Sequence, residues 1–255
     1  MAIQRTSVAV PGFMEARAHP KKRRMIVSVR GEEREGKTQF GLTAPGPIAV
    51  FPFDNNTPEL IEKWQMRKKI YVPSDSLDYT EATDMEEWKP VWEKFKQMFL
   101  DAVASPVIRT VMVDTMSEAN ELCRLARFGK LTEVPPHFYG KVNAEFKRLI
   151  DATYLTDKNI VFIHQLKDQY KGNNRTGERI LAGYTNIGYK VQINVLCWRD
   201  LSRRDAEAGT EGFGITIDNC TQNEALAGTF IEEPGNTWAG LGMLVYPGTK
   251  EGDWE

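Results

Sequence analysis

The stretch with the clearest chemistry is a glycine-rich run that ends in a lysine and a threonine. Residues 31–38 read GEEREGKT and match the pattern G-x-x-x-x-G-K-[ST]. In this pattern the two glycines let the backbone wrap closely around a phosphate chain. Lys37 neutralises the β- and γ-phosphates, and Thr38 binds magnesium through its hydroxyl group. We therefore predict a phosphate-binding loop that uses ATP and Mg²⁺.

The surroundings of this run support a nucleotide site and raise one difficulty. A predicted strand at 25–29 precedes the run and a short helix up to Thr43 follows it, which is the context that the pattern requires. Glu32, Glu33 and Glu35 bring three carboxylates near a bound polyphosphate, so we expect them to point outward. The predicted nucleotide contacts are Gly31, Glu32, Glu33, Arg34, Glu35, Gly36, Lys37, Thr38 and Gln39.

A second acidic element follows an apolar strand later in the chain. Residues 108–113 read IRTVMV and are followed by Asp114. A carboxylate at the end of such a strand holds magnesium, directly or through water, in phosphoryl-transfer sites. We predict Asp114 as this ligand together with Thr38. The alternative is that Asp114 only caps the next helix.

Hydrolysis also needs a carboxylate that orients or deprotonates water, and two residues compete for this role. Asp54 ends the predicted strand 48–53, and Glu118 lies four residues beyond Asp114. Asp54 can also be a simple turn residue. Glu118 can be the partner of Thr115 in a capping box that opens a helix. We favour Asp54 over Glu118.

The elements that must position these residues alternate between strand and helix. We predict further strands at 159–163, 190–198 and 214–217, a polar loop at 166–184 and an apolar closing segment at 236–246. One predicted helix starts with Thr57 as N-cap and Pro58 at the first helical position. Three further helices are predicted at 90–104, 116–128 and 138–155. This pattern predicts an α/β fold with a mostly parallel sheet flanked by helices and a strand-rich C-terminal extension. We expect an arm at 1–24 and one domain at 25–255.

Composition narrows the class of protein. The 255 residues carry 33 Lys and Arg against 35 Asp and Glu, a net charge of −2. This balance excludes a globally basic binder, and the 41% hydrophobic content excludes a wholly disordered chain. Cysteine and histidine, three of each, are scattered, which argues against zinc and disulfides and for a reducing cytosol. We see no secretory signal and no run long enough to span a membrane.

The order of these parts resembles the RecA-type P-loop ATPase core. The sequence style resembles the RecA-like ATP-binding proteins of phages, the Sak-type single-strand annealing proteins, over roughly residues 25–245. MIVSVRGEEREGKTQF, PIAVFPFD, VIRTVMVDTMSEANEL, NIVFIHQ and NTWAGLGML carry the resemblance. It implies a RecA-like P-loop NTPase fold, a water-activating role for Asp54, and a sensor at His164 or Gln165 that couples nucleotide to DNA.

The resemblance also implies that the loop after the sensor contacts single-stranded DNA. Its basic side chains would bind phosphates and its tyrosines would stack on bases. An ordinary solvated loop is the alternative, and the other candidate loop, 129–137, contains a single cation. The predicted DNA contacts are Lys167, Tyr170, Lys171, Arg175 and Arg179.

The same family works as rings or filaments in which a basic side chain reaches a neighbour's γ-phosphate. The resemblance therefore implies a DNA-stimulated, Mg-dependent ATPase that anneals or pairs strands in phage recombination. It also implies a homo-oligomer in the bacterial cytoplasm and a single-strand binding protein as partner. A P-loop small-molecule kinase and a non-hydrolysing, nucleotide-gated scaffold of a replication or packaging complex remain open. Candidates for the arginine in trans are Arg175, Arg179, Arg199, Arg203 and Arg204.

Overall fold

Apolar runs of the sequence form the central strands of the protein in the computed structural model, which describes residues 23–131, 138–172, 174–205 and 207–254. β4 (Thr110–Asp114) and β5 (Asn159–His164) are buried along their whole length, and β1 (Ile26–Arg30) is nearly so. Strands are apolar along their whole length when helices cover both faces of a parallel sheet. The other strands of this sheet are β2 (Ile48–Pro52), β3 (Ile70–Tyr71), β8 (Ile193–Asp205), β9 (Thr210–Cys220) and β10 (Phe230–Glu232).

The eight strands of this sheet lie in the order β10-β9-β8-β1-β5-β4-β2-β3. All pairs from β3 to β8 are parallel, and β9 and β10 add antiparallel strands at one edge. The carboxyl ends of the parallel strands therefore meet at one edge of the sheet, where ligands bind in open α/β folds. The predicted α/β class with a mostly parallel sheet and a strand-rich C-terminal part is confirmed.

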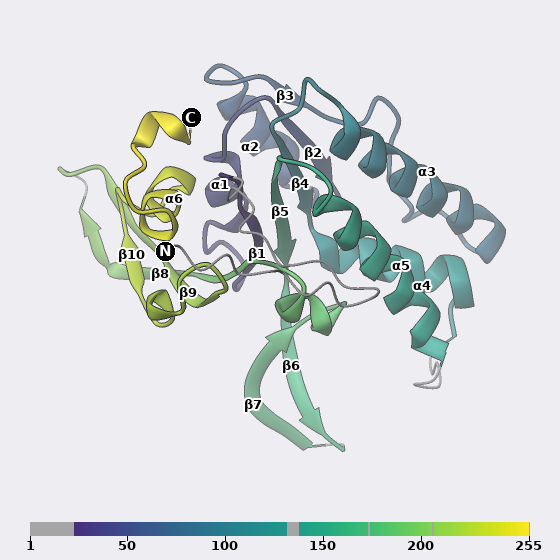
Figure 1. The fold of residues 1–255 in the computed structure, drawn as a ribbon. Helices are drawn as coiled ribbons and strands as arrows, with labels where there is room; N and C mark the ends of the chain where they lie inside the picture. The colour runs from purple at the N-terminus through teal and green to yellow at the C-terminus, as the bar shows by residue number, and fades with distance from the viewer. Residues whose placement is uncertain (1–22, 132–137, 173, 206, 255) are drawn as a thin grey trace, which may run out of the picture.

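Helices cover both faces of the sheet (Figure 1). One face carries α3 (Met85–Ala104), α4 (Met116–Phe128) and α5 (Tyr139–Thr153), and the other carries α1 (Lys37–Leu42), α2 (Thr57–Trp64) and α6 (Trp238–Val245). The aromatic stripe of α3 is packed into the core of the first face, as its helical spacing predicts. Single 3₁₀ turns lie at Thr185–Tyr189, Glu224–Leu226 and Glu251–Asp253.

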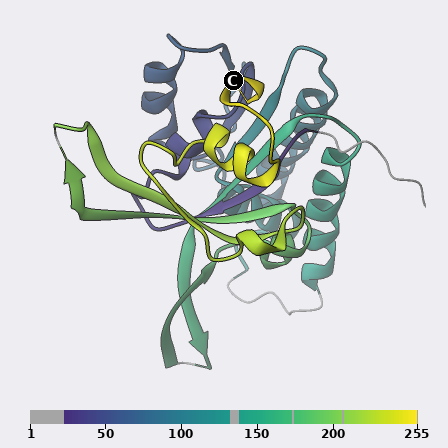
Figure 2. The same ribbon diagram turned by 60° about the vertical axis from the view of Figure 1, so that its left-hand side comes forward.

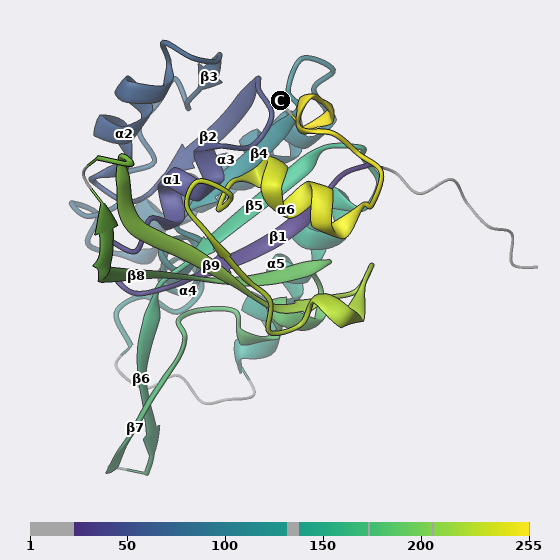
Figure 3. The same cartoon turned by 90° about the vertical axis from the view of Figure 1, so that its left-hand side faces the viewer.

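The predicted polar loop at 166–184 is wrong, because most of it forms a two-stranded ribbon. β6 (Leu166–Lys171) pairs with β7 (Asn174–Leu181) in an antiparallel hairpin with a tight turn at Gly172. The ribbon projects from the body of the protein in all three views (Figures 1, 2 and 3). Most residues of the ribbon are exposed. Its sequence therefore lacks the alternation of apolar and polar residues that indicates a strand with one buried face.

Three other elements extend beyond the ends that the sequence predicts. β8 and β9 extend beyond the predicted ends as a long antiparallel pair (Figure 3), because their outer halves are polar. α3 begins at Met85 instead of Pro90, because Asp84 accepts hydrogen bonds from the backbone N–H groups of Glu86 and Glu87.

Several expectations fall partly outside the described residues. Residues 1–22 of the expected arm and 132–137 of the second candidate DNA loop are not described. Arg24, expected in the arm, is buried and donates to the carbonyl of Thr153. The three cysteines are buried and free. Among the described helices, none combines the length and the hydropathy that a bilayer crossing needs.

Candidate functional site

The phosphate loop runs from the end of β1 into α1 and depends on both of its glycines. Gly36 has φ +79°, a conformation that other residues adopt only with strain, and a Cβ there would lie 3.1 Å from the ring of Phe213. A Cβ on Gly31 would lie 2.8 Å from the carbonyl oxygen of Cys197. The neighbouring strands β8 and β9 therefore pack directly against the loop.

Lys37 opens α1 and folds its side chain over the loop. Its ammonium group donates to the carbonyl of Gly31 at 3.0 Å and to the carbonyl of Glu32. Two neutral carbonyl groups of the loop thus hold the positively charged ammonium group of Lys37. A phosphate is a stronger acceptor than either carbonyl, so this arrangement suits a lysine that receives one.

Thr38 and Asp114 meet, although 76 positions separate them. The Thr38 hydroxyl donates to Oδ2 of Asp114 at 2.8 Å. Asp114 ends β4 and is 1% exposed, and burial raises its pKa against the opposing effect of hydrogen bonds from Thr57 and Thr38. A hydroxyl and a carboxylate side by side are the oxygen ligands that Mg²⁺ prefers. The two predicted metal ligands therefore fit the ion and face the same space.

Thr57 is a site residue that the sequence analysis misplaced. The prediction that it caps α2 is wrong, since Asn56 occupies the N-cap position. The buried hydroxyl of Thr57 instead donates to Oδ2 of Asp114 at 2.7 Å. The local sequence cannot distinguish a threonine that caps a helix from one whose hydroxyl binds a residue of another strand, because both types occur at the start of a helix.

A cavity of about 470 Å³ lies over the loop and includes Lys37, Thr38 and Asp114. Asp54 also lines it, and Oδ1 of Asp54 accepts from the backbone and side-chain amides of Asn56 at 2.8 and 3.1 Å. Gln165, beyond the end of β5, lines the same cavity. The structure thus brings Asp54 and Gln165 together with the loop, as a water-activating and a sensing role would require.

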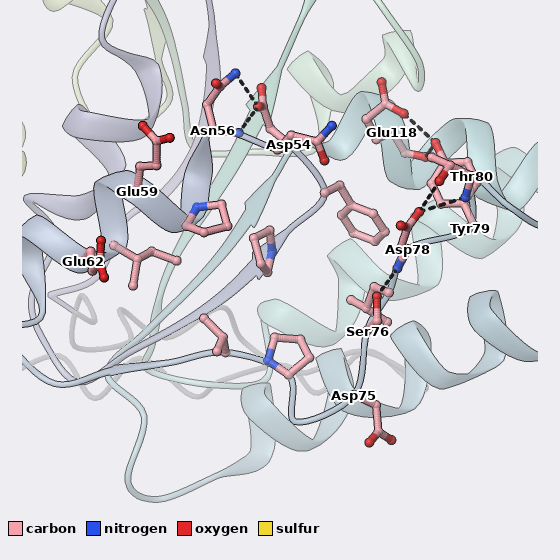
Figure 4. A pocket seen from close by; sticks show the side chains of 18 of the residues that line it. Asp54, Asn56, Glu59, Glu62, Asp75, Ser76, Asp78, Tyr79, Thr80 and Glu118 are labelled. Atoms are coloured by element: carbon pink, nitrogen blue, oxygen red, sulfur yellow. Dashed lines mark hydrogen bonds between the residues drawn. The ribbon is translucent and has the colours of Figure 1, made fainter.

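Glu118 lies elsewhere, although its backbone N–H donates to Thr115 as the predicted capping box requires. Its carboxylate accepts from the hydroxyl of Tyr79 at 2.5 Å instead of reaching back to the helix start. This pair lines a second, larger cleft beside Asp54 and does not line the cavity over the loop (Figure 4). Position therefore favours Asp54 over Glu118.

The cleft in Figure 4 has a volume of about 890 Å³ and joins the loop cavity through lining residues that the two share, among them Asp54 and Gln165. Its described lining carries several carboxylates and no lysine or arginine. Such a surface repels a phosphate backbone. Its acidic residues are Asp54, Glu59, Glu62, Asp75, Asp78 and Glu118.

His164, the other predicted sensor, is completely buried at the end of β5. Neither ring nitrogen makes a hydrogen bond with the described residues. Burial lowers the pKa of His164 to about 3, with slight opposition from the nearby backbone of Ala182. The imidazole is therefore neutral and lines neither cavity.

The three glutamates of the loop do not all point outward. Glu33 is exposed, and the carboxylate of Glu32 pairs with Arg179 at 2.8 Å. Glu35 contradicts the prediction, because its carboxylate turns back and accepts from the N–H of Glu32 at 2.5 Å. Burial raises the pKa of Glu35. One negative charge therefore stays inside the loop.

The predicted DNA contacts all lie on the β6–β7 hairpin, but only some of the charged side chains among them are in ion pairs. Arg175 pairs with Asp168 at 2.7 Å, and Arg179 pairs with both Asp168 and Glu32. Lys167 and Lys171 are exposed and have no ion pair within the described part of the chain, and Tyr170 is 58% exposed. The hairpin thus offers one lysine near its base, Lys167, and a lysine and an aromatic ring, Lys171 and Tyr170, near its tip.

Ser117 fixes the base of this hairpin to the start of α4, three residues after Asp114. Its hydroxyl accepts from the N–H of Gln165 at 3.0 Å and donates to the carbonyl of Ala182 at 2.9 Å. Both ends of the hairpin are therefore tied to the helix that follows Asp114. The sequence alone does not single out Ser117, because serine is common in the first turn of a helix.

A smaller cavity of about 180 Å³ adjoins the loop on its other side. Gly36 and Phe213 line both this cavity and the one over the loop. Trp64 and Arg67 of the α2 region form another wall. Flat apolar walls of this kind suit a nucleobase. No local sequence pattern indicates these base-binding candidates, because their side chains come from distant segments.

The remaining candidates for an arginine in trans are engaged in the structure. Arg199 and Arg204 both pair with Glu211, and Arg203 pairs with Asp200 and Glu232. Arg199 also lies 4.6 Å from the ring centroid of Phe213. None of these contacts distinguishes one arginine as the residue that acts in trans.

A family model described as AAA domain, AAA_24, matches residues 23–204. The chain belongs to this AAA domain family. The matched range contains the phosphate loop, Thr57, Asp114 and the β6–β7 hairpin. Membership in this P-loop ATPase family indicates nucleotide binding and ATPase chemistry, as the loop motif predicts.

Many solved structures are similar to this chain, and a KaiC-like protein is one example. A KaiC-like protein from the hyperthermophilic archaeon Pyrococcus horikoshii OT3 aligns with a TM-score of 0.49 at 11% sequence identity, covering 82% of this chain and 84% of that one. No curated protein matches the sequence.

Proposed function

We propose that this chain is a Mg-dependent ATPase that binds single-stranded DNA through the β6–β7 hairpin and promotes annealing or pairing of strands. The hydrogen bond between Thr38 and Asp114 carries the ATPase half of this proposal, because it brings two distant motifs into one magnesium-binding pair beside Lys37. Asp54 would orient the attacking water from the edge of the same cavity. Bound ATP would supply the phosphoryl group, and Mg²⁺ would neutralise its charge.

The base of ATP would occupy the smaller cavity between α2 and β9. Phe213 lies at the junction of this cavity with the phosphate loop, so one molecule can extend across both. Asn236 and Thr237 line the same space and offer polar groups for recognition. Replacing Phe213 by Ala should therefore weaken ATP binding more than binding of inorganic triphosphate.

Single-stranded DNA is the second half of the proposal. Lys167, Lys171 and Tyr170 combine free cations with an exposed ring, which is the chemistry that holds phosphates and stacks bases. The acidic cleft beside Asp54 would keep the strand away from the opposite side of the site. Phage recombination and a single-strand binding protein as partner follow from the resemblance to Sak-type proteins and belong to this proposal, as does a ring or filament.

The hairpin assignment is tested by salt-dependent DNA binding. Replacing Lys167 and Lys171 together by Ala should weaken binding of single-stranded oligonucleotides and flatten the dependence of affinity on salt by about two charges. Lys141 and Lys147 of α5 are exposed and provide a matched control with the same loss of charge. Equal salt slopes in the two double variants would refute the hairpin as the DNA site.

The large cleft favours a second candidate, a kinase that transfers phosphate to a small molecule. It opens beside Asp54 next to the phosphate loop, where an acceptor would lie, and its carboxylates suit a cationic acceptor. DNA-stimulated release of phosphate supports the first candidate. ATP consumption that requires an amine-bearing acceptor and yields a phosphorylated product would support the second. ATP binding without turnover would support a nucleotide-gated scaffold.

A further inference from the structure

Glu32 of the phosphate loop is held at three atoms by three different residues. Its N–H donates to the carboxylate of Glu35, its carbonyl accepts from the ammonium of Lys37, and its carboxylate accepts from Arg179 at 2.8 Å. Arg179 lies in β7, 147 positions later in the sequence. Glu32 therefore joins the cation that would meet phosphate to the base of the β6–β7 hairpin.

Arg179 binds the hairpin to itself as well as to the loop. Its guanidinium donates to the carbonyl of Leu166 at 3.1 Å and to the carboxylate of Asp168 at 3.3 Å. A planar guanidinium with acceptors on both sides fixes the relative position of the groups that it connects. Leu166 directly follows Gln165, which lines the cavity over the loop. The contact therefore lies where the hairpin leaves the site.

A phosphate bound at Lys37 would act on this contact from the loop side. A polyphosphate competes with the Glu32 carbonyl for the Lys37 ammonium, because a charged acceptor forms the stronger hydrogen bond. It also brings negative charge toward the Glu32 carboxylate. Both effects would change how Glu32 holds Arg179.

We propose that Arg179 is a positioning residue that transmits occupancy of the phosphate loop to the β6–β7 hairpin through Glu32. This inference rests on the proposed function, since the ligand that the hairpin would capture or release is single-stranded DNA. Arg179 then serves coupling, and Lys167 and Lys171 bind DNA. The Arg179 and Glu32 side chains are 38% and 42% exposed, so their ion pair contributes little to folding and is free to rearrange.

The hairpin itself can report this coupling without DNA. The native cysteines are buried, so a fluorophore on Lys171→Cys labels the exposed end of the hairpin selectively. We expect saturating ATP with Mg²⁺ to change the fluorescence anisotropy of this probe. Glu32→Gln and Arg179→Gln should each reduce that change to less than about a third. The double variant should lose no more than either single variant, because both break the same link.

Arg175→Gln is the matched control. It removes the same charge from β7 and also breaks a pair with Asp168, but Arg175 has no contact with the phosphate loop in the described structure. Its ATP-induced change should equal that of the parent protein, with saturation of each variant verified by calorimetry. A full response in Arg179→Gln, or no response in the parent protein, would overturn the coupling role. Absence of DNA binding would defeat the proposed function but would leave this readout intact.

Discussion

Thr57 donates a hydrogen bond of 2.7 Å to the carboxylate of Asp114, although the two residues come from different βα units. Thr38 reaches the same oxygen atom from α1 at 2.8 Å. The carboxylate is almost fully buried, and burial raises its pKa. Two hydroxyl donors therefore orient the group that we assign to magnesium and partly offset the cost of burying it.

Removing the Thr57 hydroxyl should affect both folding and metal use. Thr57→Val keeps the shape but leaves a buried carboxylate with one donor fewer, which should lower the free energy of unfolding by about 1–2 kcal/mol. The magnesium concentration for half-maximal ATPase should rise as well. Thr57→Ser retains the donor and should stay close to the parent protein in urea unfolding and in magnesium titration. Equal behaviour of Val and Ser would show that the hydrogen bond has no such role.

The choice between Asp54 and Glu118 can be made with two isosteric variants. Asp54→Asn should reduce kcat by at least about a hundredfold with little change in ATP affinity, because Asp54 lines the cavity over the loop. Glu118→Gln should change kcat less than about threefold, since its carboxylate binds Tyr79 outside that cavity. Single-turnover hydrolysis measures the chemical step directly. The reverse ranking would move the water-activating role to Glu118.

Glu35 should weaken ATP binding in a pH-dependent way. Burial raises the pKa of its carboxyl group, so lowering the pH neutralises it before ordinary glutamates and removes a charge that repels phosphate. Glu35→Gln keeps an acceptor for the Glu32 N–H and should bind ATP about five- to tenfold more tightly at neutral pH. The advantage over the parent protein should shrink as the pH falls. Calorimetric titrations at several pH values, with Glu33→Gln as control, test this prediction.

His164 should make the fold sensitive to mild acid. The pKa of His164 in the folded protein, about 3, lies below its ordinary value of 6.5. Between these two pH values the unfolded chain is protonated at His164 and the folded protein is not. Above pH 6.5 the stabilising contribution of neutral His164 is fully present. Between pH 6.5 and 5 the free energy of unfolding falls by about 2 kcal/mol, because the unfolded chain gains a proton. His164→Leu should show a shallower loss of stability over the same range in urea unfolding. Parallel pH profiles would contradict this assignment.

The sequence predicted the parts of this protein that local patterns encode. The loop at 31–38, the buried strand before Asp114 and the alternation of strands with helices each leave a short-range signal, and the structure contains them. The β6–β7 hairpin left none, because both faces of the ribbon are polar. Thr57 and Ser117 were misplaced or missed because their partners lie on other elements, and only the strand order brings them together.

The same reason explains why Arg179 was interpreted as a DNA contact. Its sequence neighbours are polar and basic, which is typical of a solvated or DNA-binding segment. Its partner Glu32 is 147 positions away and was expected to point outward. The composition of a segment indicates how much charge it carries, and the fold decides which of those charges are already paired.

We expect Lys37, Thr38 and Asp114 to form an ATPase site whose activity responds to DNA. Steady-state phosphate release with Mg²⁺, with and without single-stranded DNA and with Lys37→Ala as control, tests it most directly. We expect hydrolysis that single-stranded DNA stimulates and that Lys37→Ala abolishes in both conditions. Hydrolysis that survives in Lys37→Ala would contradict the site, and hydrolysis that ignores DNA would contradict its coupling to the hairpin.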